Sequence, residues 1–359
     1  MYKTDGHPFV RSQNVGLGQL LLDDIAYIDE DTHQRQKNTE LQLDDVLLNI
    51  TGASIGRSAM ATKEIVGGNV NQHVCIIRTQ DNLISSFLCN FLLSSYGQKQ
   101  IDSFQAGGNR QGLNFEQIKS IKITIPTVNE QCKIAQLLQL VEDRISTQNK
   151  IIEDLKKLKS AIIERHYSQA EKQIVCVADL GEPFNVGNLA KDDLAETGMP
   201  CVIYGELFTT YGETISQIES HTNKTEGMIL SKKGDLLFPS STTVDAMSLI
   251  APSVINVDGV ILGGDMFGIH ISTNFNAQYL SYYFNHIAKR QLAKFAKGST
   301  IIHLHYTDIE KARLLLPSLE EQDKMANCLI SLDEKIRVEK SYLQLLDKQK
   351  AYLLRQMFI

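Results

Sequence analysis

The sequence has few of the features that mark secreted, membrane-spanning or zinc-binding proteins. No apolar stretch approaches the roughly 18 residues that cross a bilayer, and the chain does not open on a basic segment followed by an apolar one. The six cysteines are scattered without a C-x-x-C pair, which argues against both a disulfide framework and a structural zinc site. We therefore expect a soluble, cytoplasmic protein without a membrane partner.

An excess of basic residues is also missing. The chain has 36 Lys and Arg against 42 Asp and Glu, a net charge of −6. Taken over the whole chain, this balance speaks against a nucleic-acid binder, which usually has a basic excess. With 359 residues, 43% of them hydrophobic, the chain is long enough for two domains with sizeable cores.

The sequence contains no recognisable catalytic constellation. The run 52–58 has the wrong spacing for a phosphate-binding loop, and Arg57 stands where such a loop needs lysine. The Asn/Asp-Pro-Pro-aromatic tetrapeptide with which amino-methyltransferases hold a flipped base does not occur. His303 and His305 share one face of an expected strand, but no third ligand lies nearby in the sequence. We predict a non-catalytic chain without a metal site.

What the sequence does contain is an internal repeat, the feature to look for first because it decides the fold. Pro126 and Pro317 lie 191 residues apart, and this offset holds from Ile118 to the end of the chain. Upstream the match is looser, as expected where loops differ in length. The looser matches relate Gly6-x-Pro8 to Gly198-x-Pro200, Asp45–Leu48 to Gly234–Leu237, and Gly67–Asn69 to Gly263–Asp265.

Each copy combines a mixed α/β part with a long helix. Residues 128–168 and 318–359 carry apolar residues at helical spacing without Gly or Pro, and helices this long need a partner, most simply each other. The expected segments are 1–127, 128–168, 169–317 and 318–359. Strands are expected at 46–50, 74–78, 121–125, 236–238, 266–271 and 312–316, and shorter helices at 85–103 and 277–296.

The segment around the two prolines resembles a known family. Its signature is Ile121-x-Ile-x-Ile-Pro126-x-x-x-Glu130-Gln131-x-Lys-Ile-Ala, and it recurs from Leu314 to Ala326. It resembles the specificity subunits of type I restriction–modification enzymes. The resemblance implies an α+β chain in which two similar α/β target-recognition domains are joined by two long helices packed as an antiparallel coiled coil.

The resemblance also implies a function in phage defence. Each domain would bind one half of a bipartite target in double-stranded DNA, and the helices would set the spacer between the halves. The helices would also dock methyltransferase subunits, two by the family pattern, and nuclease–translocase (restriction) subunits complete the complex. The chain itself would hold no cofactor, since S-adenosylmethionine, Mg²⁺ and ATP would belong to the partner subunits.

One departure concerns the first domain. In the second copy, residues 173–197 precede Gly198-x-Pro200, and their start resembles the opening strand of the family. In the first copy only residues 1–5 precede Gly6. We therefore expect the first domain to be N-terminally short by about one strand and its loop, which would expose a sheet edge.

Residues that contact DNA are expected in polar loops before the last strand of each domain. Lys289, Arg290, Lys294 and Lys297 fall within nine residues without an acid, and they lead into the loop 298–303. Arg pairs with guanine edges, and Asn or Gln with adenine edges. The predicted DNA-binding residues are Arg57, Asn71, Gln72, Lys99, Asn109, Arg110, Gln111, Lys289, Arg290, Lys294, Lys297, Ser299, Thr300 and His303, with Asn69 and His73 as weaker candidates.

The helices are expected to carry the partner-binding residues Leu155, Leu158, Ile162, Leu346 and Leu353. Two other functions remain open at this point. The chain could be a non-catalytic coiled-coil scaffold whose domains bind proteins, or a DNA-reading adaptor of another modification or defence system. Polar loops at equivalent positions of both copies favour a DNA-binding role over a protein scaffold.

Overall fold

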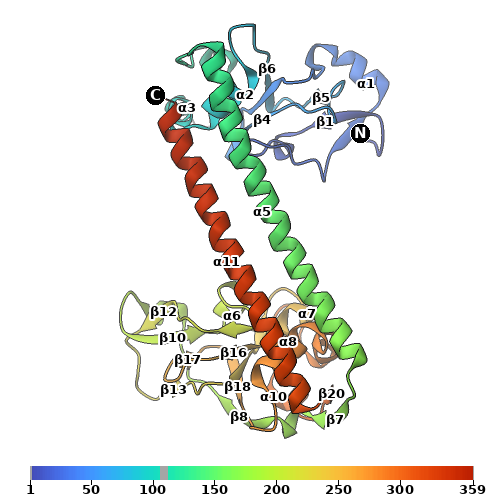
Figure 1. Ribbon diagram of the computed structural model, residues 1–359, viewed down its shortest axis with the longest axis vertical. Coiled ribbons are helices and arrows are strands. Elements are labelled where there is room, and N and C mark those ends of the chain that lie inside the picture. Colours follow the sequence, from blue (N-terminus) through green and yellow to red (C-terminus); the bar gives the residue numbers. More distant parts are fainter. Residues whose placement is uncertain (1, 106–111, 359) are drawn as a thin grey trace. The chain divides into compact units, whose positions relative to one another are not determined.

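The computed structural model describes residues 2–105 and 112–358 (Figure 1), and these fall into two compact units. The first unit comprises Met1–Ile151 with Glu339–Ile359, and the second comprises Ile152–Val338. Each unit therefore holds one mixed α/β part together with stretches of both long helices. The boundaries between the units lie inside the two long helices, because each long helix contributes to both units.

The two long helices are confirmed. Helix α5 spans Val128–Gln169 (42 residues) and α11 spans Leu319–Met357 (39 residues). The other helices are α1 (Glu30–Arg35), α2 (Ser85–Leu93), α3 (Ser95–Ser103), α4 (Phe115–Lys119), α6 (Glu206–Thr209), α7 (Ala246–Leu249), α8 (Ala277–His286), α9 (Lys289–Leu292) and α10 (Tyr306–Ile309). Among the described residues, none of these helices combines the length and apolarity needed to cross a membrane.

Local hydrogen bonds explain why the Pro-x-x-x-Glu-Gln signature starts a helix. Thr127 Oγ1 accepts a bond from the Glu130 N–H (3.3 Å), and the Glu130 carboxylate accepts one from the Thr127 N–H (3.1 Å), a reciprocal cap of α5. The buried Gln131 accepts from the Ile84 N–H (2.9 Å) and donates to the Pro126 carbonyl (3.0 Å). Ile84 lies just before α2, so Gln131 connects the start of the long helix to the domain that precedes it.

The second copy repeats this arrangement. Gln322 is buried, accepts from the Asn276 N–H (3.0 Å) and donates to the Pro317 carbonyl (2.9 Å). Asn276 is the N-cap of α8, which is the counterpart of α2. The signature is therefore architectural, because its glutamine joins the start of each long helix to the start of the preceding helix.

Polar residues occupy core positions of the helix pair. On α5, Leu138, Ile145, Ile152 and Lys159 are buried at intervals of seven residues. In the first unit Lys350 pairs with Glu142, and in the second unit Lys159 Nζ lies 2.7 Å from Asp333 Oδ1. Because contacts that lie later on α5 lie earlier on α11, the helices run antiparallel, side by side in each unit (Figure 1).

These polar contacts follow the repeat. The offset of 191 converts Lys159 into Lys350 and Glu142 into Asp333, so the two ion pairs are counterparts. It also converts Gln148 into Glu339, and these two side chains hydrogen-bond to each other. Buried polar groups at core positions of a coiled coil select one register, since any shift leaves them without partners. The duplicated helices thus pair in a register that their own polar residues specify.

The first unit contains two three-stranded sheets. One has the strand order β2-β1-β5 and the other β4-β3-β6, with β3 in the centre and wholly buried. The bounds are β1 His7–Val10, β2 Ala26–Ile28, β3 Val46–Asn49, β4 Ser58–Met60, β5 Asn69–Val70 and β6 Val74–Ile77. The 3-10 helices η1 Ser12–Asn14, η2 Lys37–Thr39 and η3 Gly52–Ser54 connect them.

The second unit contains larger versions of both sheets, with strand orders β13-β17-β10-β12-β9 and β11-β16-β14-β18-β8, and the pairs β15-β19 and β20-β7. The bounds are β7 Gln173–Cys176, β8 Gly181–Asn185, β9 Leu194–Ala195, β10 Met199–Ile203, β11 Thr214–Ile215, β12 Ser220–Thr222, β13 Ile229–Leu230, β14 Asp235–Pro239, β15 Ser241–Thr242, β16 Ser253–Ile255, β17 Ile261–Gly263, β18 Met266–Ile271, β19 Ile302–His303 and β20 Arg313–Leu316. Its 3-10 helices are η4 Val177–Asp179, η5 Lys191–Asp193 and η6 Ala293–Phe295.

Strand registers correct two details of the repeat. The carboxylate of Asp45 accepts from the Gln42 N–H, as Asp235 accepts from the Lys232 N–H, so Asp45 matches Asp235 and not Gly234. The Ile50 N–H donates to the His73 carbonyl, as the Ser240 N–H donates to that of Asp265. Asn71–His73 therefore corresponds to Gly263–Asp265, where the sequence had suggested Gly67–Asn69.

Three predicted elements differ from the structure, and one of them, the helix expected at 277–296, is divided into α8, α9 and the 3-10 helix η6. Residues 121–125 form no strand within the described chain, although their counterpart β20 pairs with β7. The helix expected at 85–103 is broken at Ser94, whose hydroxyl accepts from the Gly97 N–H and donates to the Phe91 carbonyl. A Cβ at Gly97 would lie 2.2 Å from the Phe91 carbonyl oxygen, so only glycine allows this close approach.

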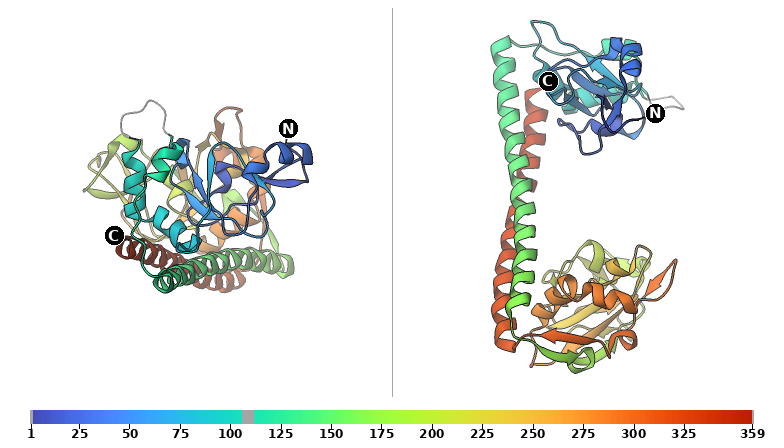
Figure 2. Two further views of the ribbon diagram at one scale, coloured as in Figure 1. Left: turned by 90° about the horizontal axis from the view of Figure 1, so that it is seen from above. Right: turned by 90° about the vertical axis from the view of Figure 1, so that its right-hand side faces the viewer.

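Each unit is closed by the end of a helix from the other copy. The C-terminal end of α11 lies beside the mixed part of the first unit (Figure 2), where Phe358 packs against Phe87 and Phe91. In the second unit Tyr167, near the end of α5, packs against Tyr283. Tyr167 and Phe358 are 191 residues apart, so the same position of the repeat fills both cores.

Candidate nucleic-acid interface

Three loops meet at the carboxyl end of β14 in the second unit. Main-chain hydrogen bonds from Ser240 to Asp265 (2.7 Å) and from Leu304 to Ser240 (2.9 Å) join the segments after β14, before β18 and after β19. The pairing of Ser241 with His303 in β15-β19 extends this contact. The loop 297–303, expected to contact DNA, therefore lies at the end of the sheet where the central strand β14 finishes.

The first unit brings the equivalent loops together at the carboxyl end of β3. The Ile50 N–H donates to the His73 carbonyl (3.0 Å), and the Leu113 N–H donates to the Ile50 carbonyl (2.8 Å). Thr51 forms a bridge with Gly112, and the Asn49 N–H donates to the Arg57 carbonyl (2.9 Å). Residues 71–73, Arg57 and Gly112–Leu113 thus lie together at the carboxyl end of β3, which we call the loop edge of the unit, as we do for its counterpart at β14.

Several predicted residues are exposed at these loop edges. Arg57 and Gln72 are exposed and Asn71 is half-buried, and in the second unit Ser299 and Thr300 are exposed and His303 is half-buried. Asn109, Arg110 and Gln111 lie outside the described residues.

Asn69 is a structural residue. It is completely buried, its side-chain oxygen lies 2.7 Å from His33 Nδ1, and its amide donates to the Gln36 carbonyl (2.8 Å). His73, the other weaker candidate, has its Nδ1 2.7 Å from Thr51 Oγ1 and is half-buried. The hypothesis of a DNA contact is therefore wrong for Asn69, because its polar atoms are used inside the fold.

The basic run 289–297 covers two short helices and the start of the loop that follows them. It is divided between α9 and η6, with Leu292 buried between them. Lys289 is half-buried, whereas Arg290 and Lys294 are exposed. Lys297 Nζ lies 2.5 Å from Asp308 Oδ1, and this hydrogen bond lowers the pKa of Asp308. The charge of Lys297 is thus partly compensated by an acid that sequence reasoning did not consider.

A tight turn presents Ser299 and Thr300. The N–H and carbonyl groups of Lys297 and His303 bond to each other (2.9 and 2.7 Å), which closes the loop. Gly298 has φ +111°, and a Cβ there would lie 2.0 Å from the Ile301 carbonyl oxygen. Because the backbone demands glycine at this point, the two hydroxyl residues are held at the tip of a defined loop.

The sequence analysis missed one residue that positions the Arg57 loop. Gln98, on α3, donates from Nε2 to the Gly56 carbonyl (3.0 Å) and to the Leu92 carbonyl (2.6 Å). The neighbouring Lys99 is exposed on the same helix. No sequence pattern indicates Gln98, because its role depends on contacts between segments about forty residues apart.

His303 and His305 lie with their ring centroids 6.2 Å apart. Within residues 2–105 and 112–358, no group of three His, Cys, Asp or Glu side chains is arranged to hold a metal ion. A hollow of ≈ 580 Å³ in the first unit is lined by Asn71, Gln72 and His73 together with Tyr2, Phe9, Ile28, Thr32 and Gln36. The residues that line this hollow are polar, aromatic or aliphatic, and none of them is Asp, Glu, Lys or Arg.

The model of the type I restriction–modification DNA specificity domain matches this chain twice, over residues 4–157 and 170–348. The chain belongs to the type I restriction–modification DNA specificity family. The two matches coincide with the two copies of the repeat, so this member of the family carries two specificity domains. Each matched region includes one loop edge and part of the long helix that follows it.

Individual members of the family are only distantly similar. The MjaVIII type I restriction enzyme specificity subunit of Methanocaldococcus jannaschii is 24% identical, over 85% of this chain and 76% of that one. A solved S subunit from M. genitalium superimposes with a TM-score of 0.61 at 15% identity, covering 100% of this chain and 90% of that chain. A structure from a study of complex assembly in a type I system gives the same TM-score and identity, covering 99% and 90%. These structures support the fold.

The five helix residues expected to bind partner subunits differ in how far they are exposed to solvent. Leu346 is buried against Val141 and Ile145, Ile162 packs into the core of the second unit, and Leu353 packs into that of the first. Leu155 is half-buried, whereas the side chain of Leu158 is 49% exposed. Their role in partner binding stays a prediction, and Leu158 is the one of these five residues that is exposed.

Proposed function

We propose that this chain is the DNA-reading subunit of a type I restriction–modification complex and that each unit contacts one half of a bipartite duplex target. The observation that carries the proposal is the loop edge, built by the same main-chain bonds at the end of β3 and of β14. The loops at these edges differ in sequence between the copies, as Asn71-Gln72-His73 and its counterpart Gly263-Gly264-Asp265 show. Two similar scaffolds with different loops suit a target whose halves differ in sequence.

The proposal divides the contacts into two classes. Arg57, Asn71 and Gln72 carry the donor and acceptor groups that read base edges in the major groove. Arg290, Lys294 and Lys297 are suited to phosphates, which position the protein without specifying sequence. Arg110, with Asn109 and Gln111, remains predicted for the first class, and Lys289 for the second.

The remaining subunits supply what this chain does not. We propose that two methyltransferase subunits dock on the helix pair, with S-adenosylmethionine, and that restriction subunits bring ATP and Mg²⁺. The net charge of −6 supports a dependence on partners, because counterion release from phosphates needs a basic surface. In this proposal the chain itself performs no chemistry and acts in the cytoplasm.

Charge removal at the loop edges tests the proposal in the assembled complex. Lys297→Ala should weaken binding to target duplex and reduce the slope of log affinity against log salt by about 1, as expected for one lost phosphate contact. Arg57→Ala should weaken binding by about 1–3 kcal/mol and relax specificity in one half of the target. Affinity is measured by fluorescence anisotropy over a salt series, and specificity by mapping methylated bases in cells.

Matched controls lie at the opposite ends of the same strands. Lys63 and Lys233 are exposed, Lys63 follows β4 and Lys233 precedes β14, so both lie away from the loop edges. Lys63→Ala and Lys233→Ala should leave the affinity and the methylated motif unchanged. Equal effects at control and loop positions would contradict the proposed placement of DNA.

A further inference from the structure

Each unit has a hollow at its loop edge, and the two hollows differ in charge. In the first unit, the hollow of ≈ 580 Å³ has Asn71–His73 in its lining. In the second unit, a hollow of ≈ 450 Å³ has the counterparts Gly264 and Asp265 in its lining. A carboxylate thus lies at the second hollow, whereas no Asp, Glu, Lys or Arg lines the first. The repeat places different chemistry at one position of two similar scaffolds.

Main-chain bonds hold Asp265 at the loop edge of the second unit. The Ser240 N–H donates to the Asp265 carbonyl (2.7 Å), and the N–H of the preceding Gly264 donates to the Gly187 carbonyl (3.0 Å). The ring of Tyr204 lies against the same segment, because a Cβ at Gly264 would come within 3.0 Å of Tyr204 Cδ1. The position of Asp265 is therefore fixed without any use of its side chain.

The carboxylate of Asp265 is available for an external partner. Asp265 is exposed, and within the part of the chain that the structure describes its carboxylate takes part in no hydrogen bond or ion pair. Asp258, at the opposite end of β17, instead accepts from the Lys233 N–H (2.7 Å). A free carboxylate at an edge that faces phosphates is repelled by them, unless the DNA itself offers it a hydrogen-bond donor.

We propose that Asp265 is a specificity-determining residue that reads cytosine in the half of the target contacted by the second unit. The inference rests on the proposed function and assigns one base contact within it. The carboxylate would accept a hydrogen bond from the N4 amino group of the cytosine in the major groove.

The chemistry of the four bases explains the choice of cytosine. An ionised carboxylate only accepts hydrogen bonds. In the major groove guanine presents two acceptors, thymine presents an acceptor and a methyl group, and adenine presents an acceptor beside its amino group. Cytosine presents a donor without an acceptor. Asp265 is therefore matched to cytosine and opposed by an acceptor on each of the other three bases.

The surroundings of Asp265 favour this contact. Val186, Leu189 and Tyr204 line the same hollow and add apolar surface beside the carboxylate, and a hydrogen bond is stronger where the local dielectric constant is low. The first unit has His73 at the counterpart position, with its Nδ1 2.7 Å from Thr51 Oγ1. Because an imidazole engaged in this way does not replace a carboxylate, we expect the two halves of the target to differ at this position.

The test compares binding of the assembled complex to its target duplex and to an unrelated duplex at one salt concentration. Asp265→Ala should weaken binding to the target about tenfold, because one base contact is lost. The same change should tighten binding to the unrelated duplex about twofold, because a negative charge near the phosphates is removed. Opposite signs for the two duplexes separate base reading from simple repulsion.

Mapping of methylated bases in cells identifies the position that is read. Asp265→Ala should make one G·C pair of the motif degenerate, in the half that Arg57→Ala leaves unchanged. Asp265→Asn should instead admit A·T at this pair, because an amide can pair with the N6 and N7 atoms of adenine. Both variants change an exposed side chain and should leave the fold intact.

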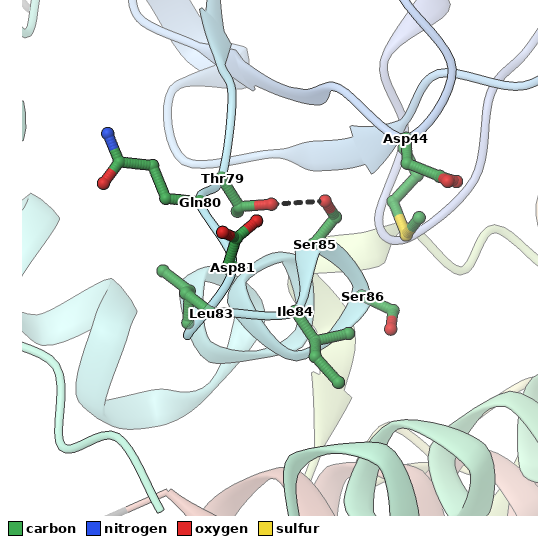
Figure 3. Close-up of a pocket in the computed structure, with 9 residues that line it drawn as sticks. Asp44, Thr79, Gln80, Asp81, Leu83, Ile84, Ser85 and Ser86 are labelled. Atoms are coloured by element: carbon green, nitrogen blue, oxygen red, sulfur yellow. Dashed lines mark hydrogen bonds between the residues drawn. The ribbon is translucent and has the colours of Figure 1, made fainter. Parts of the chain in front are cut away.

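Asp81 provides the matched control. It is exposed and lines a polar hollow of ≈ 400 Å³ in the first unit (Figure 3). It follows β6, at the end of the sheet opposite the loop edge. Asp81→Ala removes the same charge from a hollow of similar size, and it should leave both affinities and the methylated motif unchanged.

Three outcomes would overturn the inference. Asp265→Ala could tighten binding to both duplexes alike, which would show that the acid only repels DNA. The motif could keep every G·C pair, or it could relax in the half that Arg57→Ala also relaxes. Failure of the proposed function gives a different result, because the unchanged complex would then prefer no duplex over another, and both proposals would fall together.

Discussion

The two copies of the repeat share a helix register but differ in how firmly each mixed domain is joined to the helices. In the second unit, Lys159 Nζ bonds to Asp333 (2.7 Å) and to Glu213 (3.0 Å), with its side chain only 8% exposed. Tyr282 donates to Asp333 (2.6 Å) and His286 lies 2.9 Å from Glu213. In the first unit the counterpart, Lys350, pairs with Glu142 alone among the described ion pairs.

The difference shows how one helix pair can carry two unlike domains. The ion pairs Lys159–Asp333 and Lys350–Glu142 are counterparts in the repeat, whereas Glu213 comes from a loop of the second domain before β11. Burial of the charges makes the second network costly to disturb, because each acid depends on Lys159 for compensation. The first unit has the simpler ion pair, and none of its described strands pairs with the outer side of β6, so we expect the unit as described to be the less stable of the two.

The sharpest test of this comparison exchanges the two lysines for an apolar residue of similar length. Lys159→Met leaves Glu213 and Asp333 partly buried without their cation, and should destabilise the second unit by about 3 kcal/mol. Lys350→Met should cost the first unit about 1 kcal/mol, since only Glu142 loses a partner. Hydrogen exchange of peptides from each unit, measured by mass spectrometry, reports the two effects separately. Equal losses would show that the network adds nothing to the shared ion pair.

A smaller difference is expected at the edges of the sheets. Leu316→Ala removes a fully buried side chain and should cost about 2–3 kcal/mol through lost burial and a cavity. Ile125→Ala, at the counterpart position, should cost below about 1 kcal/mol, because Ile125 is 42% exposed. The free energy of local opening is measured for each variant by hydrogen exchange. A loss at Ile125 as large as that at Leu316 would mean that the edge of the first unit is already covered in solution.

The smallest effect concerns acid stability. Burial alone would raise the pKa of Glu213, but its hydrogen bond with His286 and the charge of Lys159 outweigh burial and lower the pKa to about 2 from 4.5. Its stabilising contribution is therefore complete above pH 4.5 and is lost as the pH falls towards about 2. After allowance for partial exposure this amounts to about 1–2 kcal/mol. With Glu213→Gln, the free energy of unfolding of the second unit, measured by hydrogen exchange, should fall less between pH 4.5 and about 2. That of the first unit should be unchanged.

Much of the architecture followed from the sequence because its signals are local or periodic. The 191-residue offset identified both copies, and the apolar stripe predicted α5 and α11. Strand 121–125 was predicted wrongly because alternation of Ile and polar residues describes a strand but does not supply its partner. Gln131 and Gln322 were recognised only as members of a signature, since their role depends on contacts with residues nearly fifty positions away.

The candidate interface was predicted less completely. Polarity and loop position identified Arg57 and Asn71–Gln72, and the main-chain bonds of the loop edge then brought them together. The same criteria selected Asn69, which is buried beside His33, because sequence polarity does not distinguish an exposed amide from a satisfied internal one. Asp308 was overlooked although it neutralises part of the charge of Lys297.

The sequence by itself determined that this chain is a duplication, that each copy ends in a long amphipathic helix, and which family it belongs to. These properties depend on spacing along one chain, which is visible without a structure. Only the tertiary structure decided that Lys159 serves a buried network while Lys350 has one partner among the described ion pairs, and that β7 and β8 cover the sheet edge of the second copy. Both properties depend on which distant segments of the chain meet. Burial sets how much an ion pair stabilises the fold, and the position of neighbouring strands decides whether a strand is paired.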